Sequence, residues 1–252
     1  MSTPLKSLKW YKKLATKKGR LETGVFLVAG NSAIKQIVSS HPNEIIEILT
    51  IVEPLPAYCN YPVRLVTENQ SRVICQSKTP QVAIAVVRLP ATSYSGYLPD
   101  DLGDKILLLE DIQDPGNVGT LIRTAVAFDY SGVIMTEKCA DPLSPKCVQA
   151  SAGTVLSLWT RRTRRYLELT ATLRESGYTL IVTDLNGTAE PSILNQPSKL
   201  LLALGNEATG LSSALLDTAN YRIRIPIIRE KAESLNVATC GAICMYLSSQ
   251  ML

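Results

Sequence analysis

The stretch EDIQDPGNVGTLIRTA at residues 110–125 follows directly on the apolar run 105–109 and decides how the second half of the chain is interpreted. The run is typical of a buried strand, and the residues from Val118 onward are typical of a helix. Two more polar, glycine-containing loops follow apolar runs in the same way, at 205–212 and 226–236. Because ligands bind outside the carboxyl ends of strands in open α/β sheets, these three loops predict one pocket.

Strands and helices alternate along this half of the chain. The apolar pattern predicts strands at 105–109, 132–135, 178–182, 199–204 and 222–225, and helices at 118–128, 145–152, 166–176, 212–219 and 237–247. Continuous apolar strands that alternate with helices indicate a mostly parallel sheet covered on both faces. Neither G-x-G-x-x-G after the first strand nor G-x-x-x-x-G-K-[ST] occurs, which argues against ordinary Rossmann and P-loop nucleotide sites.

The first part of the chain predicts a separate, smaller α/β domain. Short strands are expected at 21–28, 44–52, 63–66 and 81–87, with a helix at 31–39. Residues 91–104 are rich in Ser, Gly, Pro, Tyr and Asp without apolar periodicity, as is typical of a linker. We therefore expect two domains, at residues 1–97 and 98–252.

Composition excludes several classes of protein. With 46% hydrophobic and 19% charged residues, the 252-residue chain is expected to be globular. No apolar run approaches the roughly 20 residues that cross a bilayer, and the basic start is unlike a secretory signal, so a cytoplasmic location without membrane contact is expected. His41 is the only histidine, and the six cysteines form no C-x-x-C pair, so neither histidine-based hydrolysis nor a bound metal is expected.

The net charge of +4 is concentrated in two clusters. Residues 1–20 hold six lysines, Arg20, Trp10 and Tyr11 but no acidic residue, and residues 161–165 read RRTRR. Such clusters suit contact with RNA phosphates, and they equally suit a solvated protein face. The sequence leaves both interpretations open.

Together, the three loops resemble one family. The N-x-G-x-x-x-R pattern from Asn117 to Arg123, the G-x-E-x-x-G-L-S loop at 205–212, and I-P followed by S-L-N-V at 225–237 are similar to the SpoU/TrmH family of RNA ribose 2′-O-methyltransferases. The resemblance implies a SPOUT-type parallel sheet whose C-terminal part forms a deep trefoil knot. It also implies S-adenosyl-L-methionine as methyl donor and a homodimer with its sites at the subunit interface.

The resemblance assigns roles by position. The cradle for the methyl donor corresponds to Leu204, Gly205, Asn206, Ile225, Ile227 and Leu235. The catalytic positions correspond to Arg123, Asn117, Glu207, Ser234 and Asn236. Arginine normally stays protonated, so stabilising a developing alkoxide or clamping a phosphate explains Arg123 as well as a role as base does. Asn117, Ser234 and Asn236 are also common turn or helix-cap residues, and Glu207 a common loop residue.

Residues 26–39 and 79–87 look like the substrate-binding domain attached to many bacterial members, which is similar to a ribosomal protein, although Val82 stands where a glycine is usual. Such a domain favours ribosomal RNA over transfer RNA as substrate. A transfer-RNA methyltransferase, a non-catalytic RNA-binding or assembly factor, and protection against a ribosome-directed antibiotic remain alternatives.

Overall fold

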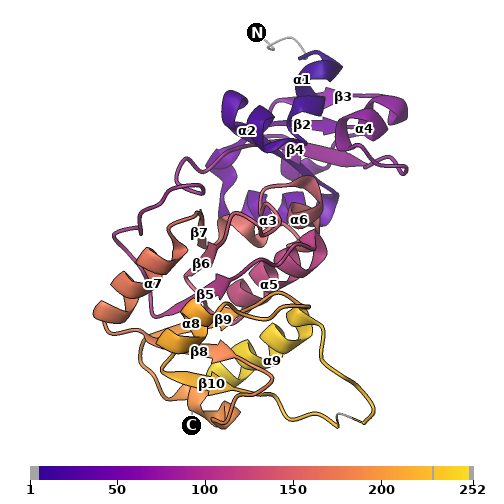
Figure 1. Ribbon diagram of the computed structural model, residues 1–252. Helices are drawn as coiled ribbons and strands as arrows, with labels where there is room; N and C mark the ends of the chain where they lie inside the picture. Colours follow the sequence, from indigo (N-terminus) through magenta and orange to yellow (C-terminus); the bar gives the residue numbers. More distant parts are fainter. Residues whose placement is uncertain (1–5, 229, 250–252) are drawn as a thin grey trace. The chain divides into compact units, whose positions relative to one another are not determined.

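The computed structural model describes residues 6–228 and 230–249 (Figure 1). The chain divides into two compact units. The first unit runs up to Ala91 and also contains Asp141–Leu156; the second unit comprises Thr92–Ala140 and the chain from Ser157 onward. The segment 92–97, which the sequence assigns to the first domain, therefore lies in the second unit, where the backbone N–H of Arg162 donates to the Ser93 carbonyl.

Within the described residues, the second unit contains a six-stranded sheet in the order β10-β8-β9-β5-β6-β7, parallel throughout. Its strands are β5 (Lys105–Leu109), β6 (Gly132–Met135), β7 (Trp159–Arg162), β8 (Thr179–Thr183), β9 (Leu200–Leu204) and β10 (Tyr221–Ile223). The predicted parallel α/β sheet is thus confirmed, while the C-terminal knot stays a prediction. Parallel pairing places the carboxyl ends of β5 and β9 side by side.

Successive residues of a strand face opposite sides of the sheet, so these apolar strands present apolar side chains on both faces. Helices pack against the sheet and bury them. Ile106 and Leu108 belong to an apolar cluster with Leu169 and Leu173 of α7 (Tyr166–Glu175) and Leu215 of α8 (Ser213–Thr218). A second pair of helices, α5 (Pro115–Ala127) and α9 (Val237–Ser249), packs together (Figure 1). A Cβ atom at Gly241 would lie only 2.3 Å from a Leu121 methyl carbon and 2.7 Å from one of Leu204, so glycine allows the close approach of α9.

The strand β7 is missing from the sequence-based prediction. Its residues Trp159, Thr160, Arg161 and Arg162 do not form an apolar run, yet Arg161 is only 4% exposed. Its guanidinium donates to the carbonyls of Tyr97 (2.5 Å) and Thr160 (2.8 Å). The Arg162 guanidinium donates to the Cys139 carbonyl at 2.9 Å. Half of the second basic cluster therefore serves to pack the sheet edge.

Over its described residues, from Lys6 onward, the first unit has a four-stranded sheet in the order β1-β4-β2-β3, in which only β2 and β3 pair in parallel. Its strands are β1 (Val25–Ala29), β2 (Ile45–Thr50), β3 (Val63–Leu65) and β4 (Ala83–Arg88). Its helices and 3₁₀ turns are α1 (Leu8–Lys13), α2 (Lys17–Thr23), α3 (Asn31–Ser40), η1 (Pro42–Glu44), η2 (Pro56–Tyr58), α4 (Glu68–Cys75), α6 (Pro145–Ala150) and η3 (Thr154–Leu156). A buried cluster anchors α1 and α4 through Tyr11, Leu14 and Ile74.

The expected strand at 21–28 begins too early. Residues Lys17–Thr23 form α2, and Gly24 ends that helix with a φ of 70°, a left-handed conformation that suits glycine. The basic segment 1–20 is described from Lys6 onward; residues 1–5 lie outside the described part of the chain. Arg20 is not part of a solvated face, because it is 1% exposed and pairs with Asp141 at 2.8 Å.

Within residues 6–228 and 230–249, no helix combines the length and apolar character needed to cross a membrane.

Candidate active site

The three loops singled out from the sequence leave β5, β9 and β10 at their carboxyl ends. The first loop enters α5, where Asp114 caps the helix by accepting from the Asn117 backbone N–H at 2.8 Å and Pro115 occupies the first turn. The second loop runs to α8, and the third runs to α9. Residue 229 of the third loop lies outside the described part of the chain.

A cavity of about 700 Å³ opens between the second and third loops. Its walls comprise 183–186, 205–211 and 223–227, together with Leu216, Glu230, Ser234, Leu235, Val237 and Cys240. Five of the six positions predicted to cradle a methyl donor line it: Gly205, Asn206, Ile225, Ile227 and Leu235. Leu204 does not; it is fully buried at the end of β9, where its carbonyl accepts from the Glu110 N–H at 2.9 Å.

The second loop is closed on itself. Asn206 and Gly210 exchange two backbone hydrogen bonds of 3.1 and 2.9 Å, and the Asn206 side-chain oxygen accepts from the Ala208 N–H at 2.9 Å. A Cβ atom at Gly205 would stand 2.4 Å from the Gly210 carbonyl carbon, so the loop closes only with glycine at 205. Gly205 thus serves the shape of the loop directly.

Three of the predicted catalytic side chains form a hydrogen-bonded chain. The Asn117 amide donates to the Glu207 carboxylate at 2.6 Å, and the Asn236 amide donates to the Asn117 side-chain oxygen at 3.2 Å. Asn236 also caps α9, because its side-chain oxygen accepts from the Ala238 N–H at 2.9 Å. The first loop, the second loop and the start of α9 are joined through this chain, and Glu207 and Ser234 also line the 700 Å³ cavity.

The structure does not bring Arg123 to these groups. It lies six residues beyond Asn117 on α5, which places it about 9 Å further along the helix and about 120° around it. The side chain is exposed, and in the described part of the chain it makes no hydrogen bond or ion pair. Within one copy of the chain, Arg123 therefore stands apart from both Asn117 and the cavity.

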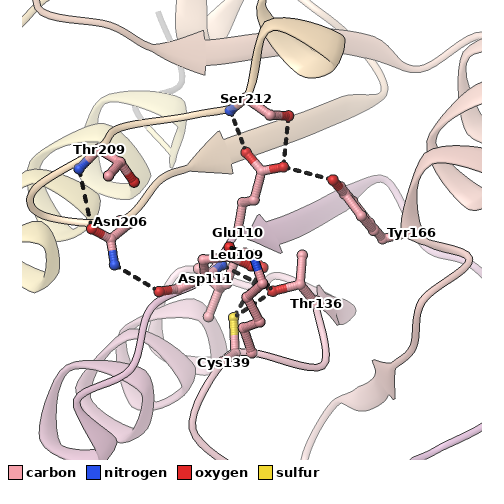
Figure 2. Close-up of polar contacts among 10 residues, drawn as sticks. Leu109, Glu110, Asp111, Thr136, Cys139, Tyr166, Asn206, Thr209 and Ser212 are labelled. Atoms are coloured by element: carbon pink, nitrogen blue, oxygen red, sulfur yellow. Dashed lines mark hydrogen bonds and ion pairs between the residues drawn. The ribbon is translucent and has the colours of Figure 1, made fainter.

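Glu110 is a residue of this region that the sequence analysis missed. Its carboxylate is buried where β5 ends and accepts from the Tyr166 hydroxyl at 2.7 Å (Figure 2). Burial and this hydrogen bond raise the pKa of Tyr166 to about 12, so the phenol stays protonated and able to donate. The sequence signal for Glu110 was its place directly after a buried strand. That signal is weak, because a glutamate at the start of a loop is ordinarily solvated.

Cys240, which lines the cavity, is also outside the predicted set. It lies one helical turn before the buried Cys244 on α9, and the hydrogen bond between the two thiols lowers the pKa of Cys240 and raises that of Cys244. Among residues 6–228 and 230–249, no group of three or more His, Cys, Asp or Glu side chains is arranged to hold a metal ion.

Solved structures share this fold along nearly the whole chain. An AdoMet-bound rRNA methyltransferase from Sinorhizobium meliloti is 28% identical and covers 96% of this chain and 93% of its own, with a TM-score of 0.80. A putative RNA methyltransferase of the TrmH family from Porphyromonas gingivalis is 27% identical and covers 98% of both chains, with a TM-score of 0.79.

Sequence comparison agrees. The 23S rRNA (guanosine(2553)-2′-O)-methyltransferase RlmP of Bacillus subtilis is 30% identical over 242 residues, which are 95% of this chain and 94% of that protein. The model of the SpoU rRNA methylase family matches residues 104–246, a span that contains all three loops. The resemblance predicted from those loops is confirmed, and the chain belongs to the SpoU rRNA methylase family.

Proposed function

We propose that the protein transfers a methyl group from S-adenosyl-L-methionine to a ribose 2′-hydroxyl of structured RNA, and that its substrate is ribosomal RNA. The observation that carries this proposal is the 700 Å³ cavity at the strand ends, which is lined by the second and third loops of the family match and by none of the residues 110–125 of the first loop. The named activity of the Bacillus relative, which aligns along 95% of the chain, supports ribosomal RNA as the substrate class.

The cavity fits the methyl donor in size and in chemistry. Small-molecule pockets span about 300–1,000 Å³ and combine apolar walls with a few polar groups. Here Ile225, Ile227 and Leu235 offer apolar surface for an adenine ring, and Asp184 and Glu230 offer carboxylates for hydroxyl or ammonium groups. When bound, the donor supplies a methyl group activated by its positively charged sulfur.

The remaining chemistry belongs to the side chains. As the ribose hydroxyl passes its proton to water, negative charge grows on its oxygen, and a fixed cation stabilises that charge. We assign this task to Arg123, acting on the oxygen or on an adjoining phosphate. Asn117, Glu207 and Asn236 hold the loops around the ribose through their hydrogen-bonded chain, and Ser234 extends this polar edge into the cavity.

The position of Arg123 supports a homodimer. An exposed arginine that lies apart from the cavity of its own chain completes a site only if a second copy brings its α5 to that cavity. We propose that each site combines the donor cavity of one protomer with Arg123 of the other. The protein is proposed to act in the cytoplasm.

The first unit is proposed to bind the RNA substrate. Its helices α1 and α2 expose Lys9, Lys12, Lys13 and Lys18, and the acidic side chain paired with them is Glu22, at 3.9 Å from Lys13 and 3.8 Å from Lys18. This excess of positive charge attracts an RNA backbone of any sequence. Recognition of one RNA must come from further contacts.

The test is mass spectrometry of ribosomal and transfer RNA from cells that lack the protein. We expect one 2′-O-methyl nucleotide to disappear from ribosomal RNA and to return with the wild-type protein, but not with Arg123→Ala. Loss of a 2′-O-methyl nucleotide from transfer RNA would mean that the substrate is transfer RNA, and the proposed methyl transfer would still hold. An unchanged set of marks in both RNA pools would contradict the proposed activity and favour a non-catalytic RNA-binding role.

A further inference from the structure

Glu110 is 4% exposed and holds the far end of the second loop. One carboxylate oxygen accepts from the Ser212 backbone N–H at 2.6 Å, and the other accepts from the Ser212 hydroxyl at 2.7 Å, in addition to the Tyr166 hydroxyl (Figure 2). A buried carboxylate with three donors is well satisfied, and hydrogen bonds to an ionised acceptor are the strong ones. The contact joins residues 102 positions apart in sequence.

The geometry of Ser212 shows that this contact takes precedence over a local one. Ser212 precedes α8 in the N-cap position, where a serine side chain ordinarily accepts from a backbone N–H of the first turn. Here it makes no such bond and donates to Glu110 instead. The start of α8 is therefore held to the end of β5 by Glu110.

The neighbouring residue Asp111 holds the near end of the same loop. The Asn206 amide donates to the Asp111 carbonyl at 2.9 Å, as Figure 2 shows. Asp111 has a φ of 58°, uncommon for a residue other than glycine, and Thr136 supports it by accepting from its N–H at 2.9 Å and donating to its carboxylate at 2.7 Å. Two consecutive residues of the first loop thus fix both ends of Asn206–Ser212.

Glu110 acts on the donor cavity from outside. It does not line the 700 Å³ cavity; it lines a second cavity of about 510 Å³ together with Tyr166, and the two cavities share Thr209, Gly210 and Leu211 as a wall. A shift of Ser212 would move this shared wall. Glu110 therefore affects the donor cavity through the loop.

We propose that Glu110 is a positioning residue for the methyl donor: by binding both the backbone and the hydroxyl of Ser212, it fixes the wall of the donor cavity. The proposal deepens the proposed function and rests on it. A glutamine at 110 has one oxygen in place of two, so its NH₂ group faces donors that the carboxylate satisfied. A buried donor without a partner shifts the loop until it finds one.

The test is isothermal titration of the full-length protein with S-adenosyl-L-methionine. We expect Glu110→Gln to weaken donor binding about 10- to 100-fold, since losing charge-assisted bonds at a buried site costs about that much in affinity. With donor at saturation, kcat and the KM for RNA should stay within about twofold of wild type. Glu175→Gln, which changes an exposed carboxylate of α7, is the matched control and should bind donor normally.

Ser212→Ala is the second variant and keeps the proposal testable if Glu110→Gln folds poorly. It removes the hydroxyl and keeps the backbone bond, so we expect a smaller loss of donor affinity, and the double variant should bind no more weakly than Glu110→Gln alone. If both single variants bind donor as wild type does, or if the two losses simply add, the positioning role is wrong. A wild-type protein that fails to bind donor would instead overturn the proposed function itself.

Discussion

The two units satisfy their buried charges in different ways. In the first unit, Arg20 pairs with Asp141 and Glu47 pairs with Arg64 at 2.6 Å, so each buried charge has an opposite charge beside it. In the second unit, Glu110 is held by hydroxyl and N–H donors, and Arg161 by carbonyl groups. Ion pairs within the packing stabilise a shape, whereas a carboxylate held by neutral donors ties together the elements that carry those donors.

Breaking an ion pair of the first unit should give the largest effect. Arg20→Met removes the buried guanidinium that pairs with Asp141 and should lower the free energy of unfolding by about 3–5 kcal/mol. Chemical denaturation measures this loss, and donor binding at low temperature should be unchanged because the cavity belongs to the second unit. Lys18→Ala, on the exposed face of the same helix, is the control and should stay within about 0.5 kcal/mol of wild type. If Arg20→Met and Lys18→Ala lowered the free energy of unfolding equally, the buried ion pair would not be what stabilises the first unit.

The role of Arg20 also shows where prediction from sequence stops. The sequence places it in a basic segment, and only the contact with Asp141, 121 residues later, shows that it is buried. The strands β5, β6 and β9 were predictable because their buried residues are apolar, while β7 was not, because arginines occupy it. Local pattern identifies burial only when the buried groups are apolar.

The site follows the same rule. Its loops were predictable because Gly, Asn and Pro after apolar runs are rare outside turns and sites, and five of the six positions predicted to bind a methyl donor line the cavity. Glu110 was not predictable, because its partner Ser212 is distant in sequence and a glutamate in a loop is ordinarily solvated. The separation of Arg123 from Asn117 follows from helix geometry, so the pattern N-x-G-x-x-x-R alone does not place both in one site.

Arg123 sharpens the comparison, because it is an exposed charge with no partner among the described residues of its own chain. Arg123→Ala should lower kcat about 10²- to 10³-fold, the usual effect of losing one fixed charge-stabilising group, and should leave donor affinity and the melting temperature unchanged. Arg174→Ala, an exposed arginine of α7, is the control. Methylation of a cognate RNA at the wild-type rate would exclude the catalytic role of Arg123.

A mixed dimer distinguishes action within one protomer from action across the interface. When Arg123→Ala and Glu207→Ala chains are co-expressed, action across the interface leaves one intact site in each mixed dimer and about half of the wild-type activity. Action within one chain leaves no intact site in that dimer. Activity of purified mixed dimers, isolated through two different affinity tags, is the measurement.

Substituting lysines of the first unit should have a smaller effect, and it should change RNA affinity alone. Lys9 and Lys12 are exposed on α1, so Lys9→Ala/Lys12→Ala should lower the slope of log affinity against log salt by about 1.4–1.8 if both contact phosphates. Filter binding at several salt concentrations measures this slope, with donor affinity as the internal control. Lys146→Ala, an exposed lysine outside α1, should leave it unchanged; an equal change in that variant would mean that RNA binding is not localised to α1.

Tyr166 should give the smallest effect, and its pH dependence tests how the second unit holds Glu110. Tyr166→Phe removes one of three donors and leaves both bonds to Ser212, so donor affinity should fall only about two- to fivefold. The pKa of this phenol is raised from 10.0 to about 12, so it favours the protonated folded state; that stabilisation is complete below pH 10 and is lost as the pH rises toward 12. The ratio of donor affinities between wild type and Tyr166→Phe should therefore stay constant from pH 6 to 9. A ratio that changes within that range would contradict the view that the Tyr166 hydroxyl donates to Glu110 as a neutral group throughout it.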